Sequence, residues 1–189
     1  MKRLIRKAIS INWDDFFYNL LNEEYSTYID MVDQIKNENQ DCLYSGEVFR
    51  VVFFEEEDVK KSIKRFQDVI IVDNEFTDEL FNLVIRDLVK VRDYEQSCSK
   101  SLRGVDFYRT TSYHQTDFSI TIKFNTSSAL DVGLLINKYK DDVSDYTYKQ
   151  YAGEYKSEEE VLSIVDSNFE VVQADAIYEE VYNIAKDKM

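Results

Sequence analysis

Apolar residues recur along much of this chain at the spacing of amphipathic helices. They stand three or four positions apart from Trp13 to Ile35, which predicts a long helix that allows one break, with Asn12 as its N-cap. The same spacing, with charged residues on the outer face, predicts further helices at 56–66, 76–88 and 129–139.

Other segments have the composition of β-strands. Residues 43–54 are rich in β-branched and aromatic side chains, and residues 118–124 alternate apolar and polar positions, as in a strand with one face in solvent. Residues 69–72 form a short apolar strand or turn. The last fifteen residues fit both a helix and an edge strand, because Ile177, Val181 and Ile184 have helical spacing while positions from Ile177 also alternate.

These elements predict one α+β domain. A length of 189 residues and an apolar content of 44% suffice for one core, whereas two domains would each be small. We divide the chain into a helical N-terminal subregion (1–42), a core (43–175) and a C-terminal element (176–189). The chain has no proline and only four glycines, which argues against a turn-dense sandwich and against a glycine-rich phosphate loop.

A net charge of −14 restricts the partners of this protein. Such a surface repels nucleic-acid phosphates and anionic membranes, so direct binding to either is not expected. Basic proteins are attracted, and these include the nucleic-acid machinery of a host cell. The same charge supports an alternative function, in which the protein mimics nucleic acid and inhibits a protein that binds it.

Cysteine and histidine are too few to build a metal site. Cys42, Cys98 and the single His114 cannot supply four zinc ligands, and two cysteines make no disulfide framework. A catalytic pair of Cys98 and His114 can be drawn, but a buried thiol beside a surface histidine is the more ordinary arrangement. Residues 1–11 lack the apolar stretch of a signal peptide, which predicts a cytoplasmic protein.

A run of acids stands directly before an apolar segment near the C-terminus. Its sequence is Ser157-Glu158-Glu159-Glu160-Val161-Leu162, and Phe169-Glu170-Val171-Val172 follows. Adjacent carboxylates repel one another, so they need a reason to stand where a strand begins. A solvated turn is the ordinary explanation. The pattern also resembles the Glu-x-Glu motif of ADP-ribosyltransferases of the arginine–serine–glutamate class, in which such a pair leads into Val-Leu and then a Phe-x-Val strand.

Two upstream motifs extend the resemblance to about residues 43–175. Arg50 lies in the strand Glu47-Val48-Phe49-Arg50-Val51-Val52-Phe53-Phe54, where the family has an arginine, although Val51 replaces a glycine that often follows it. A charged residue in such a strand needs a partner or a route to solvent, and an edge position would supply the latter. The family's serine motif matches Ser99-Lys100-Ser101-Leu102, followed by Gly104 and Phe107, or in a competing register Ser97-Cys98-Ser99. We prefer the later register because of Leu102, and a helix cap is the structural alternative.

The resemblance implies a mono-ADP-ribosyltransferase that uses NAD and no metal, and releases nicotinamide. Glu160 would stabilise the positive charge that develops on the ribose, and Glu158 would orient or deprotonate the acceptor, which favours arginine side chains. NAD would be held by the remaining matched residues: Arg50 at the pyrophosphate, with Ser99, Ser101 and Phe107.

The family also implies a fold of two packed mixed β-sheets. Residues 146–155 would form an aromatic loop that meets the target protein. Small acidic proteins of this kind resemble transferases that bacteriophages deploy in the host cytoplasm. A transferase-like protein that binds without turnover stays an alternative.

Overall fold

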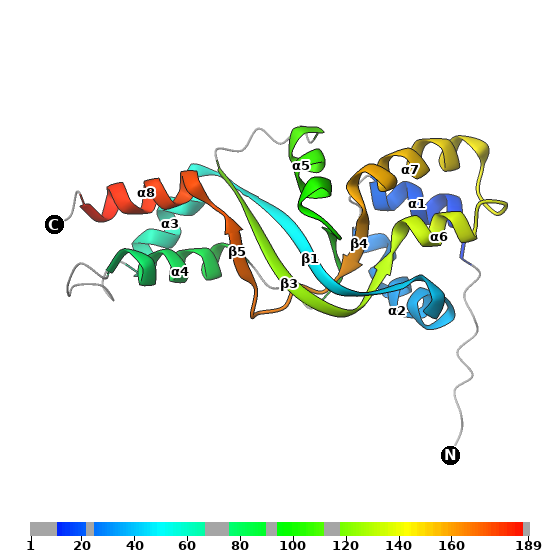
Figure 1. Ribbon diagram of the computed structural model, residues 1–189, viewed down its shortest axis with the longest axis horizontal. Helices are drawn as coiled ribbons and strands as arrows, with labels where there is room; N and C mark the ends of the chain where they lie inside the picture. Colours follow the sequence, from blue (N-terminus) through cyan, green and yellow to red (C-terminus); the bar gives the residue numbers. More distant parts are fainter. Residues whose placement is uncertain (1–10, 22–24, 67–75, 90–93, 112–117, 187–189) are drawn as a thin grey trace, which may run out of the picture.

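The computed structural model describes residues 11–21, 25–66, 76–89, 94–111 and 118–186 as an elongated α+β molecule (Figure 1). A long two-stranded ribbon of β1 (Leu43–Phe54) and β3 (Phe118–Asp131) runs through its middle. Helices α3 (Glu56–Phe66), α4 (Phe76–Leu88) and α8 (Asp175–Lys186) lie at one end. The other end holds α1 (Trp13–Leu21), α2 (Tyr25–Glu38), α6 (Val132–Lys138) and α7 (Asp145–Glu158).

The predicted N-terminal helix is described as two helices, α1 and α2, and residues 22–24 between them lie outside the described part. Asn12 caps α1 as predicted. The backbone N–H of Asp15 donates to Asn12 Oδ1 at 3.4 Å, and the Asn12 amide donates to the Asp15 carboxylate at 2.7 Å. This reciprocal pair satisfies an N–H that the first turn leaves without a helical partner.

Three short strands complete the sheet, and a helix and a 3-10 turn lie beside it. Strands β2 (Gln96–Ser99), β4 (Glu160–Ser163) and β5 (Glu170–Gln173) have four residues each. Helix α5 (Leu102–Thr111) follows β2, and a 3-10 turn, η1 (Gln40–Cys42), precedes β1. None of the helices in the described ranges has both the length and the apolar character needed to cross a membrane.

The described strands form one sheet, and this corrects the prediction of two packed mixed sheets. Every pairing is antiparallel, and the strand order is β1-β2-β4-β3-β5 with a further pairing of β1 with β3. The reason lies in the ribbon, because β1 and β3 pair from Leu43 opposite Leu130 to Phe54 opposite Phe118. The short strands all attach to this ribbon or to each other, so none of the described strands forms a second sheet.

Strands β2 and β4 connect the two strands of the ribbon. Strand β2 pairs with β1 at Phe49, and β4 pairs with β3 at Leu130 and Asp131, while β2 and β4 pair with each other. Four strands therefore close a circuit. It brings the middle of β1, the whole of β2 and the start of β4 to one place.

Gly46 permits an irregularity near the start of β1. Its φ is +150°, and the register with β3 shifts between Tyr44 and Gly46. A side chain there would place its Cβ 2.8 Å from the hydroxyl of Tyr44, which itself donates to the carbonyl of Glu47. Only glycine fits this conformation without strain.

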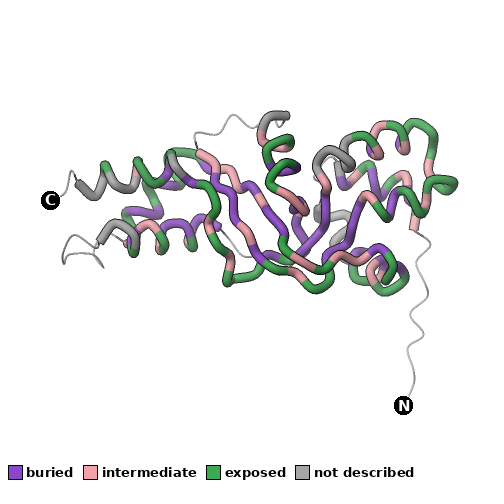
Figure 2. Tube along the Cα trace, in the orientation of Figure 1, coloured by how far each residue is buried: buried purple, intermediate pink, exposed green. Residues whose placement is uncertain are grey.

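Two apolar clusters fill the ends of the molecule (Figure 2). Neighbouring residues of the same strand serve different clusters: Val161 belongs to the cluster under α3, α4 and α8, and Leu162 to the cluster under α1, α2, α6 and α7. Since successive side chains of a strand point to opposite faces, β4 separates the clusters and contributes to both. A third, small cluster of Phe49, Val51 and Val105 fixes α5 on β1.

Several predicted elements are confirmed and two are corrected. Residues 43–54, 56–66 and 76–88 have the predicted structure, and the strand predicted at 118–124 continues to Asp131. The helix predicted at 129–139 therefore begins only at Val132. The predicted aromatic loop at 146–155 is helical and lies within α7. Tyr151 is buried in the cluster under α1, α2, α6 and α7, and this contact holds the segment against the core. The prediction for residues 69–72 lies outside the described residues.

Candidate functional site

The acidic run has three different backbone conformations in three consecutive residues. Glu158 ends helix α7, Glu159 has a left-handed φ of 52°, and Glu160 begins strand β4. A left-handed residue commonly ends a helix, but it is usually glycine, so Glu159 adopts an uncommon conformation. Its carbonyl accepts the backbone N–H of Lys100 at 3.1 Å, which holds this turn against the end of β2.

After this turn, Glu160 is the first residue of β4, and its side chain is buried. Only 7% of Glu160 is exposed, and its strand neighbour across β2 is Ser99. The hydroxyl of Ser97, diagonal to Glu160 on the same face, donates to Glu160 Oε1 at 2.5 Å. A charge-assisted hydrogen bond of this kind fixes the orientation of a carboxylate.

Arg50 approaches β2 from β1 on the face of the sheet opposite to Glu160, because Phe49 pairs with Ser99 and Ser99 pairs with Glu160. It follows Phe49, the residue at which β1 pairs with Ser99 of β2. Its guanidinium donates to the backbone carbonyl of Ser97 and leaves Arg50 half-buried. A guanidinium has five donors, so the contacts of Arg50 with this carbonyl and with the Cys98 thiol position it without using all of its capacity to bind an anion.

The Cys98 thiol is influenced by both charged groups. Burial raises the pKa of Cys98 to about 12, with Arg50 lowering it and Glu160 raising it. Both charged groups therefore act on one buried atom. Such a thiol stays protonated at neutral pH and is no nucleophile, which agrees with the ordinary interpretation of this cysteine.

The structure thus brings together Arg50, Ser97 and Glu160, which stand 47 and 63 positions apart from one another along the chain. The contact uses the Ser97-Cys98-Ser99 register, whereas the sequence favoured the later one. Ser99 is common to both registers, is 5% exposed and accepts the backbone N–H of Ser101. Strand alternation was the available signal, because two serines at i and i+2 of a strand face the same side.

The other predicted site residues lie on neighbouring elements. Ser101 caps α5, since its hydroxyl accepts the backbone N–H of Gly104 at 3.2 Å. Phe107 lies in α5 and is 37% exposed. Glu158 is the last residue of α7. The structure therefore places Ser101 as a helix cap, the structural role that the sequence also allowed.

An ion pair that the sequence did not indicate joins the serine turn to the end of β3. Lys100 Nζ lies 2.8 Å from Asp131 Oδ2, and the other oxygen of this buried carboxylate accepts the backbone N–H of Leu134 at the start of α6. Asp131 before an apolar helix is an N-cap signature, but its pairing with Lys100 depends on the sheet. Together with the bond from the Lys100 N–H to Glu159, this pair holds the turn after β2.

Comparison with known proteins finds no family model, no curated protein and no solved structure that matches this chain.

Proposed function

We propose that this protein is a mono-ADP-ribosyltransferase that transfers ADP-ribose from NAD to a side chain of a basic partner protein and releases nicotinamide. The observation that carries the proposal is the hydrogen-bonded series from Arg50 through Ser97 to Glu160. The sequence nominated an arginine, a serine motif and a glutamate separately, and in the fold they meet at the junction of β1, β2 and β4, with Arg50 on one face of the sheet and Glu160 on the other.

Glu160 supplies the negative charge that this chemistry requires. Cleavage of the bond between nicotinamide and ribose develops positive charge on the sugar, and a fixed, partly desolvated carboxylate stabilises it. Ser97 holds that carboxylate in one orientation. A preorganised charge costs little reorganisation when the bond breaks, whereas a mobile surface glutamate would need to be ordered first.

Arg50 supplies positive charge for the pyrophosphate of NAD. Its planar fork of donors suits phosphate oxygens, and the Ser97 carbonyl holds it beside β2. Val51, where the family often has glycine, points away from Arg50, to the face of the strand that Phe49 and Glu160 share, and it packs there with Phe49 and Val105. The substitution therefore adds a buried contact under α5 and leaves the side of Arg50 unchanged.

The acceptor proposal rests on charge and on the position of Glu158. A chain of net charge −14 attracts basic proteins, including host nucleic-acid machinery. Glu158 stands two residues before Glu160, at the point where α7 ends. An arginine acceptor carries a positive guanidinium, which a neighbouring carboxylate would attract and orient.

The test is to incubate the purified protein with NAD labelled in the adenylate part and a bacterial cell extract. We expect label on discrete protein bands, together with released nicotinamide. Nicotinamide without labelled protein would indicate NAD hydrolysis. Absence of both signals would contradict the proposal and favour the acidic mimic of nucleic acid, whose binding to basic proteins would fall steeply with salt.

Replacement of the two serines distinguishes the registers. Ser97→Ala removes the donor to Glu160, so we expect transfer to fall about tenfold to a hundredfold, with a loss of about 1–3 kcal/mol of unfolding free energy because the buried carboxylate loses this donor. Ser101→Ala removes a helix cap, and we expect a loss of about 1 kcal/mol of unfolding free energy with transfer retained. Labelled transfer and urea unfolding measure the two effects. Loss of transfer in Ser101→Ala, with transfer retained in Ser97→Ala, would instead favour the Ser99-Lys100-Ser101 register of the serine motif.

A further inference from the structure

Glu160 is too deeply buried to meet a dinucleotide in the closed arrangement of the site. Only 7% of this residue is exposed, whereas the proposed reaction brings its carboxylate against the ribose of NAD. An element that covers Glu160 must therefore move before the substrate enters. The identity of the substrate rests on the proposed function, but the motion itself does not.

Helix α5 lies on the face of the sheet that contains Glu160, between the two helical ends of the molecule (Figure 1). Phe49, Ser99 and Glu160 form one row of paired residues from β1 through β2 to β4. Val105 of α5 packs on Phe49 in the small third cluster. The Ser99 hydroxyl accepts the backbone N–H of Ser101 just before α5, and α5 also contacts α7, which ends just before β4. Helix α5 is therefore the neighbour of Glu160 on its β2 side.

The helices on the other side of Glu160 are held more firmly. Leu162, on the same face of β4, is buried in the large cluster under α1, α2, α6 and α7. Helix α1 alone buries four apolar side chains there: Trp13, Phe16, Phe17 and Leu20. Among residues 102–109 of α5, in contrast, Val105 is the only apolar side chain that is buried. An element with few buried apolar contacts opens at a lower free-energy cost, so α5 is the element that moves.

One arginine fastens the C-terminal half of α5 to the sheet. Arg109 Nη1 donates to Gln173 Oε1 of β5 at 2.8 Å, and Nη2 donates to the hydroxyl of Thr121 on β3. Within α5, Arg109 also lies 3.6 Å from the Asp106 carboxylate. Both acceptors outside the helix belong to the sheet, so this residue fixes the distance between the two.

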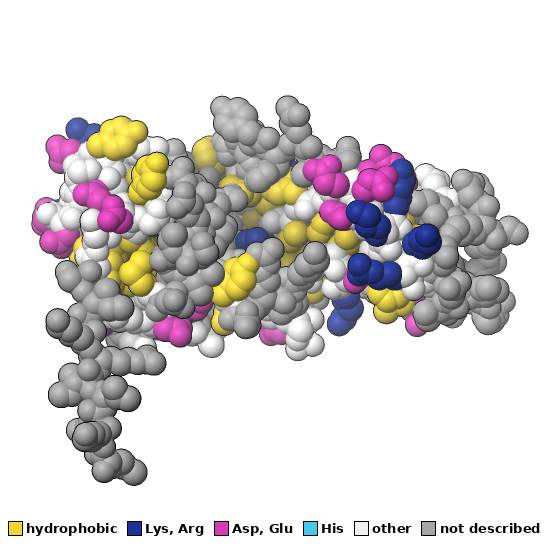
Figure 3. Space-filling model, turned by 180° about the vertical axis from the view of Figure 1, so that it is seen from behind, with side chains coloured by type: hydrophobic (Ala, Val, Ile, Leu, Met, Phe, Trp, Pro, Cys, Tyr) yellow, Lys and Arg dark blue, Asp and Glu magenta, His cyan; other side chains and the backbone are white. Residues whose placement is uncertain are grey.

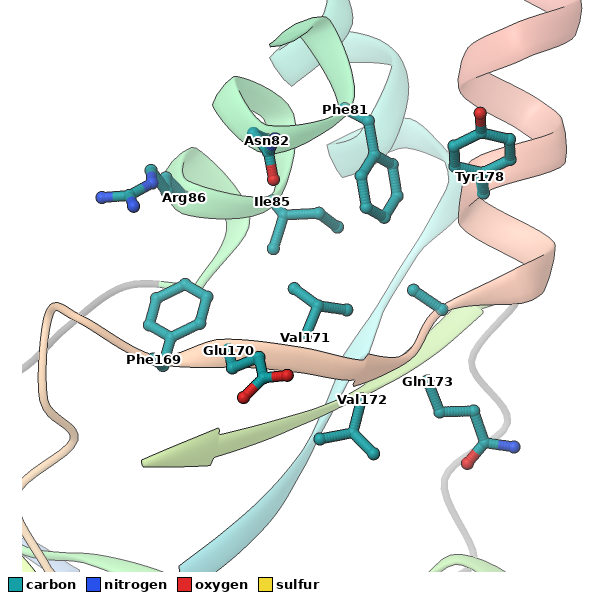
Figure 4. Close-up of a pocket in the computed structure, with 11 residues that line it drawn as sticks. Phe81, Asn82, Ile85, Arg86, Phe169, Glu170, Val171, Val172, Gln173 and Tyr178 are labelled. Carbon is teal, nitrogen blue, oxygen red and sulfur yellow. The ribbon is translucent and has the colours of Figure 1, made fainter. Parts of the chain in front are cut away.

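A bulge in β5 turns Gln173 toward α5. Val171 and Gln173 pair with adjacent residues of β3, so Val172 between them is an extra residue. Figure 4 shows the result, with Val171 pointing into the pocket beside α4 and Gln173 pointing to the opposite side of β5. In a regular strand, residues two positions apart face the same side. The bulge therefore supplies the acceptor that holds α5.

The contact of Arg109 with the sheet is incomplete. Its Nε atom is buried and has no hydrogen-bond partner among the described residues. A buried donor without an acceptor costs free energy, and this cost disappears when the group returns to water. Beside it, Tyr108 meets Phe53 of β1 with ring centroids 6.2 Å apart, and both rings are only partly buried. Arg109 therefore holds α5 closed by a contact that breaks easily.

We propose that α5 is a lid that leaves the sheet from its C-terminal end, that Arg109 is its latch, and that the uncovered face is the route by which the substrate reaches Glu160. The other end of α5 stays in place, because Lys100 before it is held by the Glu159 carbonyl and by Asp131. Opening uncovers the face from β5 and β3 toward β1, while both large apolar clusters stay closed.

A thiol introduced by Val105→Cys reports the opening of α5. Iodoacetamide alkylates a thiol only when it reaches solvent, and the buried Cys42 and Cys98 serve as references for the two large clusters. We expect the introduced thiol to be alkylated at least about tenfold faster than either reference, measured by mass spectrometry of the three peptides. Saturating ADP-ribose should slow its alkylation severalfold, because the bound ligand favours the closed lid.

Removal of the latch should accelerate this reaction selectively. Arg109→Ala in the same background should speed alkylation at position 105 about tenfold or more, because two charge-assisted hydrogen bonds are lost. Thr121→Val keeps the shape of its side chain, removes one acceptor and should act in the same direction. Both changes should leave the two reference rates within about twofold.

Arg65→Ala is the matched control. Arg65 also joins two elements, since it lies 2.7 Å from the Asp87 carboxylate across α3 and α4. This pair belongs to the end where Lys and Arg side chains stand beside Asp and Glu (Figure 3). Its loss should leave alkylation at position 105 within about twofold, because distant sites act independently.

Three results would separate the lid from the proposed function. Alkylation at position 105 no faster than at Cys98, or equal acceleration of all three thiols by Arg109→Ala, would overturn the lid. Transfer of ADP-ribose to protein, with no effect of ADP-ribose on alkylation, would overturn the entry route and leave the proposed function standing. Selective opening of α5 with neither transfer nor an effect of ADP-ribose would contradict the proposed function but not the lid.

Discussion

Glu160→Gln is expected to reduce transfer of ADP-ribose about a thousandfold while the fold is retained. The amide keeps the shape of the side chain and still accepts the Ser97 hydroxyl, but it carries no charge to stabilise the developing positive charge on the ribose. Replacing a buried carboxylate by a neutral isostere removes a desolvation cost, so the unfolding free energy should change by less than about 1 kcal/mol. Labelled transfer and urea unfolding on the same preparations measure both quantities.

Glu95→Gln provides a matched control for this experiment. Glu95 is also a buried glutamate, 6% exposed, and it stands immediately before β2. Its carboxylate pairs with Lys36 of α2 at 2.7 Å. We expect this variant to lose stability, because the Lys36 charge stays buried without its partner, and to retain transfer.

The two glutamates thus predict opposite results from the same chemical change. If Glu160→Gln transferred ADP-ribose as fast as the original chain, the proposed role of Glu160 would be wrong. If Glu95→Gln lost transfer to the same extent as Glu160→Gln with unchanged stability, the effect could not be assigned to Glu160. Comparison of the two variants therefore separates loss of catalysis from loss of structure.

The local structure could be predicted well from the sequence, because it depends on the spacing of apolar residues within each element. The strand 43–54 and the helices 56–66 and 76–88 are examples. The last residues left two interpretations open, since their spacing fits both. Packing decides between them: Ile177 is fully buried and Tyr178 meets Phe81 of α4, so residues from Asp175 form a helix.

Strand pairing could not be predicted, because it joins residues far apart in the sequence. Strands β1 and β3 pair with each other along their whole length, so neither is left to form a second sheet. No local sequence pattern indicates this pairing. The arrangement of the candidate site could not be predicted for the same reason. The sequence nominated Arg50 and Glu160, but the choice between Ser97 and Ser101 depends on the register of β2 against β4, which places Ser99 opposite Glu160.

Phe17→Ala is expected to produce the largest loss of stability among the changes considered. Phe17 is fully buried and packs against Trp13, Phe16 and Tyr151, with ring centroids 5.3 to 6.4 Å apart. Removing such a side chain costs about 3–5 kcal/mol, from lost burial and from the cavity left behind. Tyr18→Ala is the control, because Tyr18 is the next residue of the same helix and its side chain is 60% exposed. We expect it to change the unfolding free energy by less than about 1 kcal/mol.

The two cysteines report where Phe17→Ala loosens the molecule. Cys42 shares the cluster of Phe17, whereas Cys98 belongs to the other large cluster, and both are buried with a raised pKa. At pH 8 each thiol is protonated in the native state, so labelling by a thiol reagent requires local opening. We expect Phe17→Ala to accelerate labelling of Cys42 more than that of Cys98, measured by mass spectrometry of the two peptides. Equal acceleration would show instead that the clusters open together, through the strands β3 and β4 that contribute to both.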